Sequence, residues 1–305
     1  MTALKCREVS VRDRTKGRTP GAAYRDPRLT RAGLGEDVYH RSHFVTLGFR
    51  MSENSFPAPK DTRCAVIIPA RLASTRLPGK PLADIHGMPM ILHVWQRAVA
   101  ADVGPVYVAS ADRAIANAVT AAGGNAIMTD PTLPSGSDRV FAALEVIDPH
   151  GDITTILNVQ GDLPAIDPAS IRRALDPLRD PDVDIATLVC PIVDPAERNR
   201  SSVVKAVVAW QPGGDIGRAL YFSRSAVPWG EGELLHHIGL YAYRRAALER
   251  FVRLPPAPLE QRESLEQLRA LAAGMRIDVA SVAAIPLGVD TQDDLDRARA
   301  MLAPG

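Results

Sequence analysis

The sequence predicts an α/β fold in which helices flank a mostly parallel central sheet. Short apolar segments, such as residues 65–68 and 153–159, suit strands that are buried on both faces. Segments with helical spacing of apolar residues alternate with them, as in right-handed βαβ units. A loop rich in small and basic residues follows the first strand, at the place where open α/β sheets bind their ligands.

The composition is that of an ordinary globular protein, with 305 residues, 46% hydrophobic and 23% charged, and it allows one large domain or two small ones. The net charge of +1 gives no reason to expect a nucleic acid or a membrane as partner. No segment approaches the ~18 apolar residues of a membrane span. The three cysteines, Cys6, Cys64 and Cys190, are widely spaced, which fits neither a disulfide framework nor a zinc site and suits a reducing cytoplasm.

Residues 1–60 differ from the rest of the chain. Before Met51 there are eleven Lys and Arg residues against five Asp and Glu residues, without apolar periodicity. The segment is either a disordered basic arm or, as we favour, the product of an over-extended start with Met51 as the true first residue. We expect residues 61–305 to form a single domain with a substrate-binding or dimerisation insertion around residues 190–260.

The individual elements follow from local patterns. Apolar and β-branched runs predict strands at 65–68, 106–109, 126–128, 153–159, 185–189, 203–210, 219–222, 238–243 and 277–282. Helical spacing predicts helices at 90–101, 112–122, 137–147, 244–251, 258–273 and 291–302. Asp112 and Thr291 are expected N-caps, Ser137 or Asp138 should begin the third helix, and Gly213-Gly214 should form a turn between two strands.

The basic loop after the first strand is the first candidate site. Ten positions hold three cations and three small residues: Arg71, Arg76 and Lys80 with Ser74, Thr75 and Gly79. Small residues let backbone N–H groups approach an anion and the cations neutralise it, so the loop is a candidate polyphosphate site. A solvated basic loop is the alternative. Because Pro81 follows the Gly-Lys pair, this is not the P-loop motif G-x-x-x-x-G-K-[ST].

Two carboxylates are candidates for a metal site. Asp162 ends the strongest predicted strand, and Asp290 immediately precedes the last predicted helix. Beside a phosphate-binding loop the pair would suit Mg²⁺, which takes one or two carboxylates and completes its coordination with phosphate oxygens and water. The alternatives are a turn residue for Asp162 and a helix N-terminal carboxylate for Asp290.

Other polar residues are weaker candidates. The Ser135-Gly136 turn enters a helix, so it could accept a base or phosphate edge or simply cap the helix. Neighbouring strand residues point to opposite faces, so at most one of His236 and His237 can face the ligand crevice. Arg224 and the pair Glu266-Gln267 could contact a polyhydroxy acid or lie on the surface.

From residue 64 to residue 302 the chain resembles the CMP-Kdo synthetase (3-deoxy-manno-octulosonate cytidylyltransferase) family of sugar-activating cytidylyltransferases. The basic loop is similar to their signature L-x-x-R-x-x-S-[TS]-R-L-P-x-K. Further similar segments follow in order: MTDPTLPSGSDR, LNVQGDLP, LYFSRSAVPW, HIGLYAYR, PLEQRESLEQLR and GVDTQDDLDRAR. The resemblance implies a Rossmann-like nucleotide-diphospho-sugar transferase fold and a homodimer. It also implies CTP-dependent transfer of CMP to the anomeric hydroxyl of Kdo, with release of pyrophosphate, for lipopolysaccharide biosynthesis in the cytoplasm.

The resemblance also implies residue roles. The nucleotide would contact Ala70, Arg71, Ser74, Arg76, Lys80, Ser135, Gly136 and Gln160. The acceptor would contact Gln160, Arg224, His237, Glu266 and Gln267. Mg²⁺ would be held by Asp162 and Asp290. The catalytic set would be Arg71, Arg76, Lys80 and Asp162, because attack on a polyanion depends mostly on positioning and charge neutralisation.

Three departures from the family pattern keep other functions open. Leu163 stands where the family has an acidic residue, Leu133-Pro134 replaces a His-Gln pair, and segment 229–236 is short. One alternative is a cytidylyltransferase of the same fold that acts on another small acid, such as amino-Kdo, a sialic-type acid or phosphonoformate. A second is an inactive relative that binds nucleotide or a partner, although such a protein has no chemical need for both carboxylates.

Overall fold

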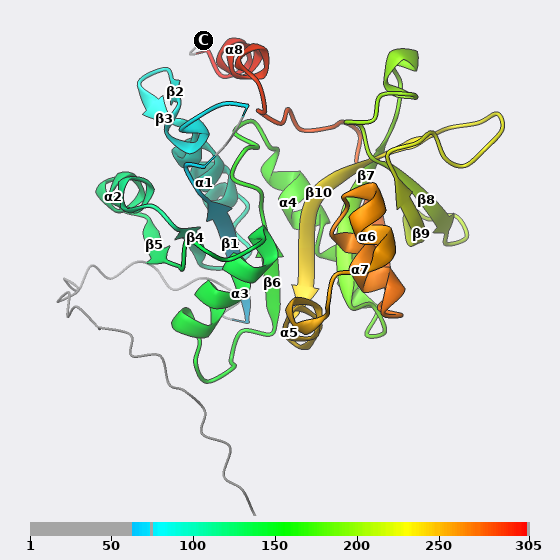
Figure 1. The fold of residues 1–305 in the computed structure, drawn as a ribbon, viewed down its shortest axis with the longest axis horizontal. Coiled ribbons are helices and arrows are strands. Elements are labelled where there is room, and N and C mark those ends of the chain that lie inside the picture. The colour runs from blue at the N-terminus through cyan, green and yellow to red at the C-terminus, as the bar shows by residue number, and fades with distance from the viewer. Residues whose placement is uncertain (1–62, 74–75, 304–305) are drawn as a thin grey trace, which may run out of the picture. The chain divides into compact units, whose positions relative to one another are not determined.

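Strand β1 (Cys64–Ala70) lies within a mixed nine-stranded sheet in the computed structural model, which describes residues 63–73 and 76–303 (Figure 1). Its side chains alternate between two layers. Val66 and Ile68 pack in the core on one face, and Ala65 and Ile67 pack in the core on the other. Burial on both faces explains why this strand is a continuous apolar run. Residues 1–60, predicted to be either a disordered basic arm or an over-extended start, lie outside the described residues.

The strand order is β5-β4-β1-β6-β10-β7-β11-β9-β8. The other strands are β4 (Val106–Ser110), β5 (Asn125–Met128), β6 (Thr155–Asn158), β7 (Ile185–Pro191), β8 (Lys205–Trp210), β9 (Ile216–Ser223), β10 (Leu235–Arg244) and β11 (Ile277–Ser281). Strands β9 and β10 run against the others, so the prediction of a mostly parallel sheet is confirmed. The Gly213-Gly214 turn joins β8 to β9, as predicted.

Helices form a layer on each face of the sheet. They are α1 (Met90–Ala100), α2 (Arg113–Ala121), α3 (Gly136–Ile147), α4 (Pro168–Arg173), α5 (Arg245–Arg253), α6 (Pro258–Glu263), α7 (Gln267–Ala272) and α8 (Gln292–Met301), with short 3-10 turns η1 (Lys80–Leu82), η2 (Asp176–Arg179) and η3 (Pro195–Glu197). Helices α1, α2 and α4 bury their apolar residues in one core, and α3, α5 and α7 bury theirs in the other.

Strand β10 belongs to two parts of the sheet. Its carboxyl half, Tyr241 to Arg244, pairs with β6, whereas Leu235 and His236 pair with β8 on the same edge. Strand β7 pairs along the opposite edge, with a register shift between Ile238 and Tyr241. Strands β8, β9, β11, β7 and β10 are therefore hydrogen-bonded in a closed ring. The segment expected as an insertion, 190–260, supplies β8, β9 and β10.

The single helix predicted at 258–273 is wrong, because the structure has two helices, α6 and α7, in its place. Ser264 adopts a left-handed conformation (φ 53°) that ends α6. The carbonyls of Glu263 and Ser264 accept hydrogen bonds from the Arg224 guanidinium at 2.7 and 3.1 Å. A tertiary partner thus binds two carbonyl groups that a continuous helix would use internally.

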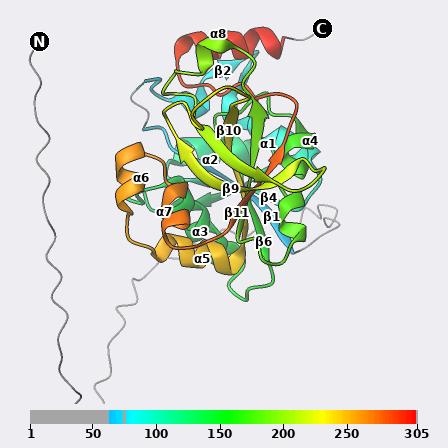
Figure 2. The same ribbon diagram turned by 90° about the vertical axis from the view of Figure 1, so that its right-hand side faces the viewer.

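Among the described residues, helix α4, a two-stranded hairpin and the 3-10 turns were not predicted. Helix α4 begins with Asp167 as N-cap and Pro168 as its first residue, a local signal that was available in the sequence. A hairpin of β2 (Asp84–Ile85) and β3 (Met88–Pro89) turns at His86 and Gly87, which both have positive φ, as in a type I′ turn. Helix α8 lies beside this hairpin in both views (Figures 1 and 2).

Candidate active site

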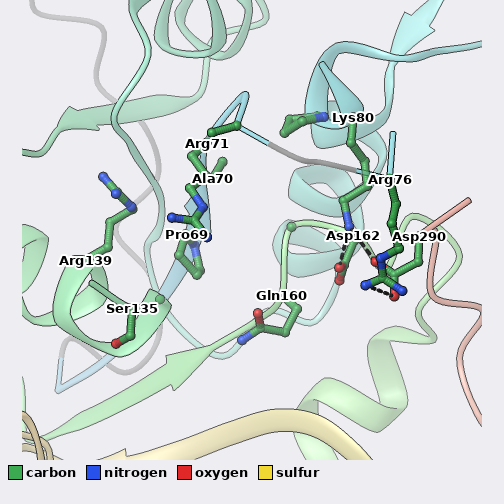
Figure 3. Close-up of a pocket in the computed structure, with 14 residues that line it drawn as sticks. Pro69, Ala70, Arg71, Arg76, Lys80, Ser135, Arg139, Gln160, Asp162 and Asp290 are labelled. Carbon is green, nitrogen blue, oxygen red and sulfur yellow. Dashed lines mark hydrogen bonds and ion pairs between the residues drawn. The ribbon is translucent and has the colours of Figure 1, made fainter. Parts of the chain in front are cut away.

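A cavity of about 410 Å³ opens at the carboxyl ends of β1 and β6. This edge of the sheet is where α/β folds bind ligands. Figure 3 shows Arg71, Arg139 and Ser135 on one side of the cavity and Lys80, Arg76, Asp162 and Asp290 on the other, with Gln160 between them. The lining is completed by Pro69, Ala70, Ala73, Pro81, Gly136 and Gly161.

The loop after β1 is anchored before it reaches Lys80. The Asp112 carboxylate accepts a hydrogen bond from the Leu72 backbone N–H at 2.7 Å. Asp112 does occupy the N-cap position of α2, but its side chain makes no capping hydrogen bond and holds this loop instead. Gly79 has a φ of 69°, a conformation that favours glycine, and turns the chain into η1. Ser74, a predicted nucleotide contact, lies outside the described residues.

Lys80 lies between the two predicted metal ligands. Its Nζ is 2.9 Å from Asp162 Oδ2 and 3.1 Å from Asp290 Oδ1, and its side chain is 15% exposed. Arg76 also pairs with Asp290, at 3.1 Å. Burial alone would lower the pKa of the Lys80 ammonium, but Asp162 and Asp290 outweigh that effect and raise the pKa above its ordinary value. Lys80 is therefore a cation at neutral pH.

Two close backbone approaches bring these segments together. A Cβ at Gly161 would lie 2.9 Å from the Pro69 carbonyl oxygen, so the chain after β6 can pass the end of β1 only with glycine at this position. The Val289 N–H donates to the Asp162 carbonyl at 2.9 Å. These contacts place Asp162 and Asp290 side by side although they are far apart in the sequence.

The opposite side of the cavity is built by the start of α3. Ser135 is its N-cap, accepting a hydrogen bond from the Asp138 N–H at 3.2 Å, so the helix begins earlier than the predicted Ser137 or Asp138. Arg139, one turn into the helix, is 2% exposed and donates to Thr129 Oγ1 and to the Asp130 carbonyl. Burial lowers the pKa of Arg139, and the positive charge of Arg71 lowers it further.

Arg139 was missed by sequence reasoning, although it lies in the quoted segment SGSDR, four residues after Ser135. Its position in the first turn of α3 points its side chain back toward the N-terminal end of the helix. Its bonds to Thr129 and Asp130 hold the guanidinium at the cavity wall.

The donor set on the Lys80 side fits a magnesium ion. The Asp162 and Asp290 side chains are 33% and 46% exposed at the cavity. Within residues 63–73 and 76–303 there is no group of three or more His, Cys, Asp or Glu side chains that could hold a metal by itself. Two carboxylates with room for phosphate oxygens and water are the ligands that Mg²⁺ prefers beside a nucleotide.

The residues predicted to face the acceptor divide into those that line the cavity and those that do not. Gln160 lines it, and its amide donates to Asn158 Oδ1 at 3.1 Å. Glu266 lies behind the Ser135 turn, where Oε2 accepts from Ser137 Oγ at 3.0 Å and the buried Oε1 makes no hydrogen bond. Burial raises the pKa of the Glu266 carboxyl.

His237 and Gln267 are buried and bonded to each other. We assign the ring tautomer from the network: Nε2–H donates to Thr187 Oγ1 at 3.0 Å, and Nδ1 accepts from the Gln267 amide at 3.5 Å. The Thr187 hydroxyl lies within 3.0 Å of the carbonyls of Ile238 and Leu240 at the β10 register shift. Burial, with a smaller effect of His236, lowers the pKa of His237 to about 3, so the ring is neutral at physiological pH.

Arg224 does not line the cavity. Its guanidinium donates to the carbonyls of Ser201, Glu263 and Ser264 at 3.0, 2.7 and 3.1 Å. The Glu263 carboxylate in return accepts from the Arg224 N–H and from Ser223 Oγ. In this arrangement Arg224 fixes the turn between α6 and α7, which carries Glu266 and Gln267.

Leu163, one of the departures from the family pattern, is a core residue. It is 8% exposed and packs in the same core as α1 and α4. Its side chain lies 3.8 Å from the position that a Cβ would take at Gly288, in the segment that leads to Asp290. An apolar residue here is therefore accommodated by packing.

None of the described helices is long and apolar enough to cross a membrane.

The fold and the charged cavity are those of an α/β nucleotidyltransferase. Residues 65–277 match the model of the family described as cytidylyltransferase. The chain belongs to the cytidylyltransferase family, and it shares the fold of a solved synthetase. That structure, CMP:2-keto-3-deoxy-manno-octonic acid synthetase complexed with CTP, superposes with a TM-score of 0.73 at 42% identity, covering 79% of this chain and 99% of that chain.

Curated relatives are more similar to this chain in sequence than the solved synthetase is. The 3-deoxy-manno-octulosonate cytidylyltransferase of Rhodospirillum centenum is 64% identical over 239 residues, which cover 78% of this chain and 93% of the relative. The protein of the same name from Parvibaculum lavamentivorans is 62% identical over 238 residues, which cover 78% of this chain and 92% of the relative. The similarity therefore extends over nearly the whole length of these relatives.

Proposed function

We propose that this protein transfers CMP from CTP to the anomeric hydroxyl of 3-deoxy-manno-octulosonate (Kdo) and releases pyrophosphate. The observation that carries the proposal is the convergence of Arg76, Lys80, Asp162 and Asp290 in one cavity that also holds Ser135 and Arg139. The names of the relatives at 64% and 62% identity support Kdo as the acceptor. The CTP in the solved synthetase supports CTP as the donor.

The cavity has a different chemistry at each side. On the α3 side, the Ser135-Gly136 turn and the Arg139 guanidinium offer donors suited to the O2 and N3 acceptors of cytosine. On the η1 side, Lys80 and Arg76 offer the cations that a triphosphate requires. Arg71 lies near Arg139, so the triphosphate would run from Arg71 toward Lys80.

The reaction needs orientation and charge neutralisation. The anomeric oxygen of the acceptor forms a bond to the α-phosphorus and loses its proton, while the bond from that phosphorus to the bridging oxygen of pyrophosphate breaks. Negative charge develops on the leaving group, and Lys80 and Arg76 neutralise it. No side chain in the described residues is assigned as general base.

We propose that Asp162 and Asp290 hold Mg²⁺ when CTP is bound. When bound there, the ion would reduce the repulsion between nucleophile and triphosphate and stabilise the pyrophosphate. The Lys80 ammonium already pairs with both carboxylates. When the metal binds, Asp162 and Asp290 must therefore either release the ammonium or bind the ammonium and the metal together. Asp162→Asn should abolish turnover without loss of the folded state, and near-normal turnover with Mg²⁺ would refute this assignment.

We propose that Gln160 contacts the acceptor directly. We also propose that Glu266, behind the Ser135 turn, offers a further hydrogen-bond acceptor to the sugar acid. Glu266 Oε1 makes no hydrogen bond and lies 3.9 Å from Arg269 Nη2, so it can accept a hydrogen bond from a sugar hydroxyl. The bonds of Gln267, His237 and Arg224 to protein groups support a role in shaping the acceptor end.

The test is pyrophosphate release from CTP and Mg²⁺ with four acceptors: Kdo, amino-Kdo, a sialic acid and phosphonoformate. We expect release with Kdo. Release with another acid alone would keep the cytidylyltransferase assignment and refute Kdo as the acceptor. CTP binding without release for any acceptor would favour the inactive relative.

Three further properties are proposed for this protein. We propose that it acts as a homodimer, in the cytoplasm where CTP is made, and that its product supplies lipopolysaccharide biosynthesis. Sedimentation of the purified protein tests the first, fractionation of cells tests the second, and loss of Kdo from the lipopolysaccharide of a deletion strain tests the third.

A further inference from the structure

The backbone of Asp290 is tied to the start of the C-terminal helix. The Asp294 carboxylate accepts hydrogen bonds from the N–H groups of Asp290 and Thr291 at 3.1 and 3.0 Å and from Thr291 Oγ1 at 2.8 Å. These bonds include the capping box that begins α8, in which Thr291 is the N-cap as the sequence predicts. Any movement of α8 therefore moves Asp290.

The chain before Asp290 is anchored only close to that residue, at the buried Val289. The Val282 N–H donates to the Val189 carbonyl at the end of β11, and the next backbone hydrogen bond is that from Val289 to Asp162. Residues 283–288 form neither helix nor strand, and Ile285 is 42% exposed. The position of Asp290 thus depends on its neighbour Val289, which is bonded to Asp162 and buried in a small core, and on where α8 docks against that core.

Helix α8 docks on the β2–β3 hairpin. Leu295 and Ala298 pack in a small core with Ile85 and Met90. Arg299 adds polar contacts: its Nε and Nη2 donate to the Asp84 carbonyl at 3.0 and 2.8 Å. The His86 Nε2 is 2.7 Å from the Arg299 carbonyl, to which it donates.

The hairpin also follows Lys80 closely along the chain. Strand β2 begins at Asp84, four positions after Lys80, which is the first residue of η1. Arg299 therefore links the helix that follows Asp290 to the segment that carries Lys80. Figures 1 and 2 both show α8 lying beside this hairpin.

We propose that Arg299 is a positioning residue for the metal site: by binding the Asp84 carbonyl, it holds α8 so that Asp290 lies beside Asp162 and Lys80. This inference rests on the proposed function, because it takes Asp290 as a ligand of the divalent cation. Without the Arg299 contact, α8 would leave the hairpin more often, and Asp290 would be available to the cation for a smaller fraction of the time.

The experiment compares Arg299→Ala, Arg299→Lys and Arg297→Ala. Arg297 is a matched control because it lies on the same helix, is 65% exposed and, among the described residues, pairs with Asp294 through Oδ1, whereas the bonds from Asp290 and Thr291 use Oδ2 and are left in place by Arg297→Ala. Mn²⁺ binding is followed by electron paramagnetic resonance in the presence of CTP. We expect Arg299→Ala to raise the half-saturating Mn²⁺ concentration about tenfold, equivalent to about 1.4 kcal/mol. Arg299→Lys, which keeps a cationic donor, should restore most of the affinity, and Arg297→Ala should leave it unchanged.

Hydrogen exchange of the α8 amides provides a second readout that does not depend on turnover. We expect faster exchange in Arg299→Ala than in the native protein. Because coupling is reciprocal, Mn²⁺ with CTP should slow exchange in native α8. Steady-state kinetics should show a raised requirement for Mg²⁺ with kcat at saturating Mg²⁺ changed by less than about twofold.

Two results would overturn the inference. One is an Arg299→Ala protein whose α8 exchanges faster while its Mn²⁺ affinity is native. The other is an Arg299→Ala protein whose α8 exchange is unchanged. Asp290→Asn separates this failure from that of the proposed function: native Mn²⁺ affinity in Asp290→Asn would refute Asp290 as a ligand, whatever Arg299 does.

Discussion

Replacing Lys80 with methionine should have opposite effects on cation binding and on catalysis. In the native protein the Lys80 ammonium lies 2.9 and 3.1 Å from the two carboxylates, where it competes with a divalent cation for them. Lys80→Met keeps most of the side-chain volume and removes the charge. Asp162 and Asp290 then face the cavity without this cation, and their mutual repulsion favours a divalent ion.

The expected size follows from the two contacts. A charge-assisted hydrogen bond contributes about 1.5–3 kcal/mol. The Asp290 side chain is 46% exposed, so solvent screening reduces its share, and we take about 1.4 kcal/mol in total as the lower bound. Mn²⁺ binding without CTP should therefore tighten at least about tenfold. Turnover should fall by about a hundredfold, since the pyrophosphate loses a cation that neutralises it.

The assay is Mn²⁺ titration by electron paramagnetic resonance without nucleotide, alongside pyrophosphate release with CTP and Kdo. Lys80→Arg is the matched control, because it keeps a cation at the carboxylates, and its Mn²⁺ affinity without CTP should stay near the native value. Native Mn²⁺ affinity in Lys80→Met would refute the competition between ammonium and metal. Native turnover would refute the role of Lys80 in stabilising the triphosphate.

Three further predictions concern two residues of the cavity wall, Arg139 and Ser135, and the buried His237. Arg139→Lys, which loses the planar guanidinium, should raise KM for CTP about tenfold with kcat little changed, and a native KM would argue against contact with the base. Ser135→Ala removes the N-cap of α3 and should lower the free energy of unfolding by about 1 kcal/mol in urea, so native stability would contradict the cap. The pKa of buried His237 is lowered to about 3 from 6.5, so the unfolded chain binds the extra proton and stability falls as the pH drops through that window. His237→Gln should reduce the stability loss between about pH 7 and about pH 4.5 by about 2 kcal/mol, and equal losses in both proteins would show that His237 is not the group involved.

Much of the fold was predictable because its signals are local. The apolar run of β1, the Gly213-Gly214 turn and the Thr291 cap each depend on residues within a few positions of one another. The same holds for the basic loop with Lys80, whose place after the first strand predicted which edge of the sheet would hold the cavity. The segment that contains Ser135 was also identified from its own residues, although Ser135 itself caps the helix.

Other features depend on contacts that no local pattern reports. Lys80 and Asp290 are 210 residues apart, and they meet where Val289 binds the Asp162 carbonyl and packs with α8 and the β2–β3 hairpin. The helix predicted at 258–273 is interrupted because Arg224, on a distant segment, binds the carbonyls of Glu263 and Ser264. The sequence by itself thus determined the class of fold, the edge of the sheet and the charged residues of the site other than Arg139. The tertiary structure decided which of those residues share the cavity, because strand order and helix docking depend on packing between residues that are distant in the chain.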